Sequence, residues 1–172
     1  MSPALRPWTL LAALMTVVVG AAPAFGQSVR GFVTAAERGP LAGANVAVQR
    51  LAEAEAVGDV RVATGEIPGA DMDTLRDLAE TARNRMTATG GGGVAVFGSA
   101  DAEEGKAYLA ASVTDDVIAQ GVQAGKLVGA LAKTVGGGGG GRPTLATAGG
   151  KNPDGLADAL GAAADQVRAM LG

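Results

Sequence analysis

A stretch of small and basic residues between Lys133 and Lys151 is the part of the sequence best suited to bind a ligand. Six consecutive glycines are followed by Arg142 and Pro143, and a second turn of small residues ends at Lys151. A glycine loop exposes its backbone N–H groups, and a basic residue at each end favours an anion. This pattern predicts a phosphate-binding loop without catalytic residues. The residues expected to contact phosphate are Gly136, Gly137, Gly138, Gly139, Gly140, Gly141, Arg142, Gly149, Gly150 and Lys151.

The charge pattern around this stretch also favours an anionic ligand. No acidic residue lies between Asp116 and Asp154, and the same window contains Lys126, Lys133, Arg142 and Lys151. The whole chain of 172 residues has a formal net charge of -3, so the window is basic against an acidic background. The alternative is that the glycine run is a disordered linker. An amphipathic helical pattern before the run and a patterned segment after it favour an ordered loop.

The composition excludes several kinds of active site. The sequence has no histidine and no cysteine, so it can form neither a Ser-His or Cys-His catalytic pair nor a disulfide. A histidine-based zinc site and an imidazole general base are excluded for the same reason. Aromatic residues make up only 3% of the chain, which leaves no platform for stacking several bases. The sequence therefore offers no active site or metal centre built on histidine or cysteine, and we expect no metal or cofactor.

Residues 1–26 have the pattern of an export signal. Arg6 precedes an apolar run from Trp8 to Ala22, and residues 22–26 supply the small side chains that a signal peptidase reads. The run of 15 residues is shorter than the roughly 20 residues that a membrane-spanning helix needs. The sequence therefore predicts a cleaved signal peptide and no stable membrane span.

Residues 27–49 have the alternating pattern of a β-hairpin. Residues 31–33 and 40–46 resemble the start of a carboxypeptidase regulatory-like domain, a small β-sandwich. A single hairpin lacks the further strands that would cover its apolar face. We interpret this segment as a partial domain without a function of its own.

Residues 50–172 alternate between strand and helix patterns. Residues 50–57 are compatible with a short helix, and 90–93 with a simple glycine connector. Three glycines four residues apart, Gly121, Gly125 and Gly129, predict a helix face that closely approaches another element. The expected strands are 60–64, 94–98 and 107–113, and the expected helices are 71–86, 114–135 and 154–170. The sequence therefore predicts a compact α/β domain in which a mixed sheet packs with about three helices.

Five segments of this domain resemble the DHH-associated (DHHA) C-terminal domain of bacterial alanyl-tRNA synthetase. They are residues 73–79, 94–99, 124–128, 135–143 and 148–151. The resemblance implies a domain that is not an enzyme, performs no chemistry and binds the outer corner of tRNA. In nucleases of the same group, the glycine motif contacts the nucleic acid. The related nucleases have a histidine after the glycines, where this chain has Arg142. The catalytic and editing modules, and most of the preceding helical arm, have no counterpart in these residues.

Two other roles remain open at this point. The domain could serve packing or subunit contact, including a homodimer, without binding nucleic acid, because its net charge is acidic. Alternatively, the first fifty residues could carry the function, as an exported receptor-associated β-type module. The export pattern and a cytoplasmic tRNA partner point to different compartments. A chimera joined near Arg50 is our hypothesis for this disagreement.

Overall fold

The computed structural model describes residues 49–172, of which 49–52 are helical. The predicted signal peptide, residues 1–26, lies outside the described residues. The carboxypeptidase-regulatory-like segment, residues 27–49, also lies outside them except for Gln49. The domain boundaries, the export signal and the proposed chimera therefore stay predictions. No helix within residues 49–172 combines the length and apolar character that crossing a membrane requires.

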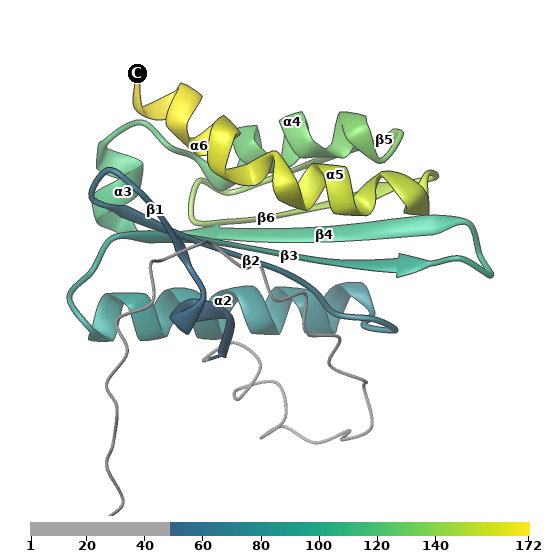
Figure 1. The fold of residues 1–172 in the computed structure, drawn as a ribbon, viewed down its shortest axis with the longest axis horizontal. Coiled ribbons are helices and arrows are strands. Elements are labelled where there is room, and N and C mark those ends of the chain that lie inside the picture. Colours follow the sequence, from purple (N-terminus) through teal and green to yellow (C-terminus); the bar gives the residue numbers. More distant parts are fainter. Residues whose placement is uncertain (1–48) are drawn as a thin grey trace, which may run out of the picture. The chain divides into compact units, whose positions relative to one another are not determined.

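A six-stranded mixed sheet forms the centre of the domain (Figure 1). The strand order is β1-β2-β3-β4-β6-β5, and only the β2–β3 pair is parallel. The strands are β1 (Glu55–Val57), β2 (Val60–Glu66), β3 (Gly93–Asp101), β4 (Lys106–Val113), β5 (Gly137–Gly141) and β6 (Leu145–Gly150). The expected α/β class with a mixed sheet is confirmed.

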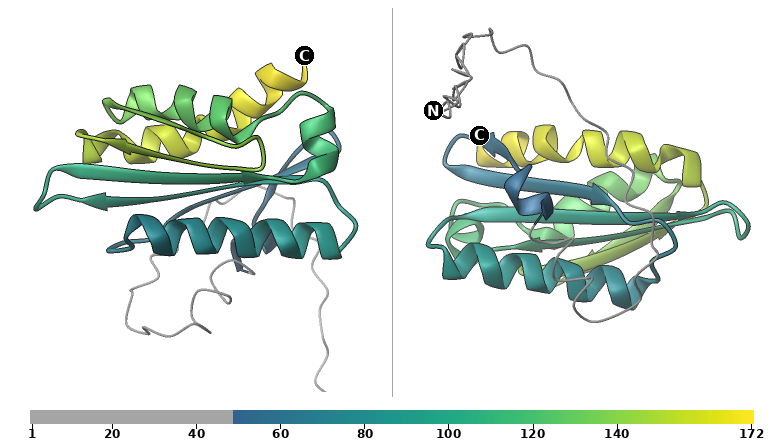
Figure 2. Two further views of the ribbon diagram at one scale, coloured as in Figure 1. Left: turned by 180° about the vertical axis from the view of Figure 1, so that it is seen from behind. Right: turned by 60° about the horizontal axis from the view of Figure 1, so that its bottom comes forward.

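Helices cover both faces of the sheet (Figures 1 and 2). Helix α2 (Met72–Ala88) covers one face and connects the parallel strands β2 and β3. Leu51 of the short helical segment 49–52 packs against the same layer of the core. The opposite face carries α4, α5 and α6, while α3 lies at one end of the sheet. These helices are α3 (Asp115–Ala119), α4 (Ala124–Thr134), α5 (Leu156–Gly161) and α6 (Ala163–Leu171), and a 3-10 turn at Pro153–Gly155 precedes α5.

The core has two layers because successive strand residues point to opposite faces. On β3, Val94 and Val96 pack on the side of α4 to α6, whereas Ala95 and Phe97 pack against α2. Most of the other buried side chains are Ala, Val and Leu. The composition predicted such a core of small aliphatic residues.

Helix α2 follows the predicted pattern closely. The Asp71 carboxylate accepts a hydrogen bond from the Thr74 backbone N–H at 2.8 Å and caps the first turn. At the other end, Gly90 and Gly91 donate to the carbonyls of Thr87 and Met86, with Gly90 at a φ of 71°. Five residues at helical spacing form its buried face: Leu75, Leu78, Ala79, Ala82 and Met86. The first glycines of the 90–93 connector thus also cap the helix.

The single helix expected over 114–135 is wrong, because the chain forms two helices, α3 and α4. Gly121 has a φ of 104°, which ends α3. Its N–H donates to Ile118, and the N–H of the buried Val122 donates to Val117. This is the same arrangement of hydrogen bonds that ends α2.

Two other elements differ from the sequence prediction. Residues 55–57 form β1 instead of continuing a helix, because Gly58, with a φ of 62°, turns the chain into a hairpin with β2. The last helix is divided at Ala162 into α5 and α6. Along these two helices, Leu156, Ala163 and Val167 are buried, and Leu160 and Met170 pack against the core.

Thr114 joins the start of β3 to the end of β4. Its buried hydroxyl oxygen accepts from the Gly93 N–H at 2.9 Å and lies 3.3 Å from the Gly93 carbonyl oxygen, to which it donates. Thr114 occupies the N-cap position of α3, but its side chain does not bond to that helix.

We predict that Thr114→Val lowers the free energy of unfolding by about 1–3 kcal/mol, because it leaves the Gly93 N–H buried without an acceptor. Urea unfolding followed by circular dichroism measures the change. Thr114→Ser keeps the hydroxyl and should recover most of the stability, and Thr147→Val, on a partly exposed strand position, serves as the control. Equal stabilities of the Val and Ser variants would contradict the role of this hydroxyl.

A second prediction concerns the acid dependence of stability. Hydrogen bonding to Thr74, through its hydroxyl and its backbone N–H, lowers the pKa of Asp71 below its ordinary value of 3.8. The ionised cap therefore stabilises the fold above that value, and this contribution is lost as the pH falls through the lower pKa of the folded state. Between about pH 2 and 6, the unsubstituted chain should have a higher free energy of unfolding than Asp71→Ala, and this difference should shrink as the pH falls. In Asp71→Asn, whose side chain does not titrate, this loss should be absent.

Candidate nucleic-acid interface

The glycine run forms a strand and not the predicted loop. Strand β5 (Gly137–Gly141) pairs antiparallel with β6, from Gly137 opposite Gly150 to Gly141 opposite Ala146. Glycine has no intrinsic preference for strands, so the local sequence does not indicate one. The pairing partner β6 determines the conformation. Only Gly136, with a φ of 64°, retains a turn geometry before the strand.

Close packing against β6 explains why part of this strand consists of glycine. A Cβ added at Gly139 would lie 2.7 Å from both the Cα of Ala148 and the carbonyl oxygen of Thr147. At Gly138 and Gly140, an added Cβ would meet no atom within 4 Å. Successive glycines of β5 therefore alternate, one facing the backbone of β6 and the next facing open space.

Helix α4 packs over the same strand through its own glycines. A Cβ at Gly125 would lie 3.1 Å from the Gly141 carbonyl oxygen, and one at Gly129 would lie 3.9 Å from that of Gly139. The predicted close approach is confirmed at Gly125, whereas an added Cβ at Gly129 would make an ordinary van der Waals contact. Gly121 does not take part, because it lies in the turn between α3 and α4.

Strand β5 lies at the edge of the sheet, and all five of its residues are exposed. An antiparallel edge strand directs about half of its N–H and C=O groups away from its partner. Because β5 has no side chains, a ligand can approach these backbone donors directly. The accessible backbone N–H groups expected from a glycine loop are therefore provided by the edge of a strand.

Two predicted site residues are less accessible than the sequence suggested. Gly149 and Gly150 belong to β6, an internal strand paired with both β4 and β5. Gly150 is buried opposite Ala107 on one side and Gly137 on the other. The sheet ladders use much of the backbone hydrogen bonding of these two residues, although Gly149 is solvent-exposed.

The two basic residues of the motif lie at opposite ends of the β5–β6 hairpin. Arg142 opens the turn and donates its backbone N–H to the Leu145 carbonyl at 2.9 Å, whereas Lys151 follows the last residue of β6. At about 3.3 Å per residue, the strand separates them by about 20 Å. Both side chains are exposed. They cannot bind one phosphate together, as a loop would have allowed.

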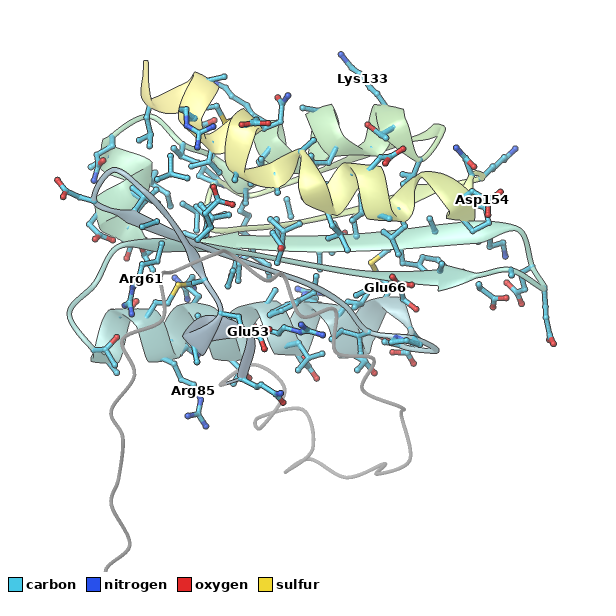
Figure 3. The ribbon with its side chains drawn as sticks, in the orientation of Figure 1. Glu53, Arg61, Glu66, Arg85, Lys133 and Asp154 are labelled. Atoms are coloured by element: carbon cyan, nitrogen blue, oxygen red, sulfur yellow. The ribbon has the colours of Figure 1, made fainter. Side chains whose placement is uncertain are left out.

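Two further lysines lie above this edge. Lys126 and Lys133 are exposed on α4 and are seven residues apart, so they share a helix face with Gly129, which approaches β5. Figure 3 shows Lys133 extending from α4 into solvent. This seven-residue spacing is visible in the sequence, but its relation to the glycine run is not.

We call β5 together with Lys126, Lys133, Arg142 and Lys151 the basic edge. Within residues 49–172, the ion pairs involve Arg50, Lys106 and Arg168, and none involves a cation of the basic edge. The same part of the chain contains no group of three or more Asp or Glu residues that could hold a metal ion. The geometry is suited to binding extended anions through backbone N–H groups and separate cations.

Comparison with known proteins identifies the family of this domain. The family model described as the DHHA1 domain matches residues 59–169, which contain the whole basic edge. The chain belongs to the DHHA1 domain family. The match begins after β1 and ends within α6.

Relatives of this DHHA1 domain include alanine–tRNA ligases. The ligase of Acaryochloris marina (strain MBIC 11017) is 49% identical over 123 residues, and that of Acidothermus cellulolyticus (strain ATCC 43068 / DSM 8971 / 11B) is 44% identical over 126. Each alignment covers 72% of this chain and 14% of the ligase. The chain therefore corresponds to a small part of these enzymes.

A solved structure supports the same assignment. The C-Ala domain of Aquifex aeolicus alanyl-tRNA synthetase has a TM-score of 0.58 and 29% sequence identity. The match covers 67% of this chain and 97% of that domain. The predicted resemblance to the C-terminal domain of alanyl-tRNA synthetase is confirmed, and this DHHA1 domain has its fold.

We predict that Gly139→Ala lowers the free energy of unfolding by about 1–3 kcal/mol, because the added methyl overlaps the β6 backbone. The matched change Gly138→Ala places its methyl in open space and should be neutral or slightly stabilising. Amide hydrogen exchange along β5 and β6 should accelerate in the first variant alone. Equal effects at the two positions would contradict the close packing of this hairpin.

Proposed function

We propose that the domain is a non-catalytic nucleic-acid-binding module, with tRNA or another structured RNA as its partner. The observation that carries this proposal is the basic edge, an exposed strand without side chains next to four cations. The relationship to alanine–tRNA ligases supports tRNA as the partner. In this proposal the domain is an accessory module, and the chemistry of such a ligase belongs to other modules.

Binding would use phosphates and shape instead of base sequence. Backbone N–H groups at the edge of β5 can donate to phosphate oxygens, and the lysines and Arg142 add charge. Glycine offers no side-chain donors or acceptors for reading base edges. Recognition of a structured RNA by its backbone is consistent with this set of groups.

The spacing of the cations favours an extended ligand. Arg142 and Lys151 are about 20 Å apart along the strand, so they would contact different phosphates. The cations of the basic edge form no ion pair within residues 49–172, so binding an RNA would break no such pair. Each phosphate that is neutralised would release counterions.

A structural or subunit-contact role is the second candidate. Two observations favour it: the formal net charge of -3, and an unprotected edge strand that a second chain could extend. Such a role does not require cations at the edge, whereas RNA binding requires them. Salt dependence therefore separates the two candidates.

We predict salt-sensitive binding of tRNA to the 172-residue chain, measured by filter binding over a series of salt concentrations. Arg142→Ala with Lys151→Ala should weaken binding and reduce the slope of log K against log salt by about 1.4 to 1.8, for two lost phosphate contacts. The backbone N–H groups of Gly149 and Gly150 are unchanged in this variant. Comparison with the unsubstituted chain therefore measures the contribution of the two side-chain charges to binding.

The matched control is Arg85→Ala with Arg168→Ala. It removes the same charge from exposed positions on α2 and α6 and should leave the slope nearly unchanged. Absence of binding at low salt by a folded chain would refute the RNA proposal and favour the structural role. Equal effects of the two double variants would show that net charge, and not the basic edge, governs binding.

A further inference from the structure

A cavity of about 620 Å³ opens between the start of α2 and the β3–β4 hairpin. Its volume is in the range of small-ligand sites. Residues 69–73 form one wall, and residues from Ser99 to Tyr108 form the other. None of its lining residues belongs to the basic edge, so any inference about it is independent of RNA binding.

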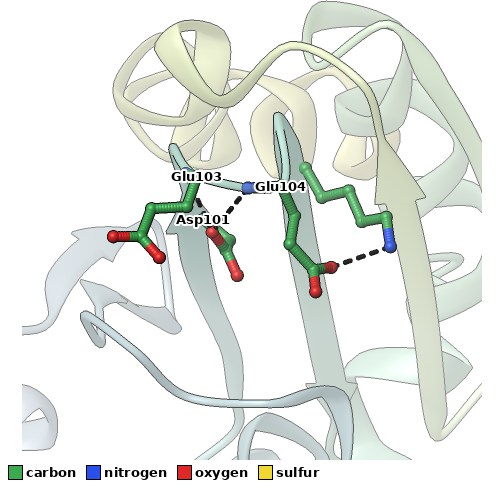
Figure 4. A network of polar contacts seen from close by, with 4 residues as sticks. Asp101, Glu103 and Glu104 are labelled. Atoms are coloured by element: carbon green, nitrogen blue, oxygen red, sulfur yellow. Dashed lines mark hydrogen bonds and ion pairs between the residues drawn. The ribbon is translucent and has the colours of Figure 1, made fainter.

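Carboxylates dominate the polar lining of this cavity, and no basic side chain lines it. Asp101 accepts hydrogen bonds from the backbone N–H groups of Glu103 and Glu104 at 3.0 and 2.9 Å, and Glu104 pairs with Lys106 at 2.8 Å (Figure 4). Asp71 caps α2. Asp73, the fourth carboxylate, has no hydrogen bond or ion pair with any residue in 49–172.

Ser99 gives the cavity a second polar feature. The residue is only 1% exposed, and its hydroxyl makes no hydrogen bond within the described part of the chain. Among the side-chain polar atoms described, Arg83 Nε alone is both fully enclosed and unpaired. Ser99 is one of the residues that line the cavity. A ligand that donates a hydrogen bond to such a buried hydroxyl would remove the free-energy cost of leaving it unpaired.

We infer that this cavity binds an organic cation, namely a primary ammonium group on an aliphatic chain. An ammonium group has three donors and no acceptor, which complements the Asp73 carboxylate and the Ser99 hydroxyl. The Tyr108 ring adds a surface on which a cation can rest, and Ala70 and Met72 can contact the aliphatic chain.

A metal ion fits this cavity less well. Three or more suitably placed ligands are needed, and residues 49–172 contain no such group of Asp and Glu side chains. Three of the four lining carboxylates are also engaged, in the α2 cap, in the turn and in the ion pair with Lys106. An ammonium group needs only one free carboxylate and neighbouring acceptors.

The test is a titration of the 172-residue chain with 1,4-diaminobutane, followed by calorimetry and by NMR. We expect saturable binding that Asp73→Asn weakens at least about tenfold and Ser99→Ala weakens measurably. Asp77→Asn, on the same helix but outside the cavity lining, should leave the affinity within about twofold. Because Asp73 is exposed, its variant keeps the test valid if Ser99→Ala does not fold.

The ammonium group could come from a free amine or from a lysine of a partner protein. N-acetyl-lysine amide is therefore titrated in parallel, and binding of that probe alone would identify a lysine side chain as the source. The neutral 1,4-butanediol should not bind. The inference is wrong if neither amine shows saturable binding, if the diol binds equally well, or if Asp77→Asn weakens binding as much as Asp73→Asn.

Discussion

The contact between α4 and the β5–β6 hairpin constrains most of this structure. Gly125 lets the helix approach the backbone of β5, and Gly139 lets β5 approach β6. A methyl group at Gly139 would overlap β6, and one at Gly125 would press closely on β5. The arrangement therefore depends on glycine, which has no side chain, at these positions. It determines how closely α4 approaches the sheet. Because α4 carries Lys126 and Lys133, it also affects how far their charges lie from the strand edge.

The basic edge and the lining of the cavity have opposite electrostatic character. Residues 117–153 contribute cations without a carboxylate, and they gather at one edge of the sheet. The start of α2 and the β3–β4 turn contribute mostly carboxylates. A net charge of -3 therefore conceals a division into basic and acidic regions, which is why the overall balance is a poor guide to the partner.

Local signals predicted the parts of the fold that depend on local chemistry. The helical pattern over 71–86 predicted α2, in which Leu75, Leu78 and Met86 are buried, and the strand patterns over 94–98 and 107–113 predicted β3 and β4. The glycine run and its basic flanks were found, but not its geometry, because glycine carries no strand preference and β6 imposes the pairing. The break at Gly121 was hidden by a regular glycine spacing that continued across it. The acidic cavity had no sequence signal, since tertiary folding alone joins Asp73 to Ser99.

The uniform composition of β5 has a consequence for how its pairing is aligned. In most strands, different side chains make one register better than its neighbours, but five identical glycines make every register chemically alike. The alignment with β6 is therefore set from outside the strand, by the buried Val135 before it and by the Arg142-Pro143 turn after it. A glycine gained or lost within the run would leave the strand itself unaltered. The two anchors would then be out of step by one residue, and the positions of Lys133 and Arg142 relative to each other would change with them.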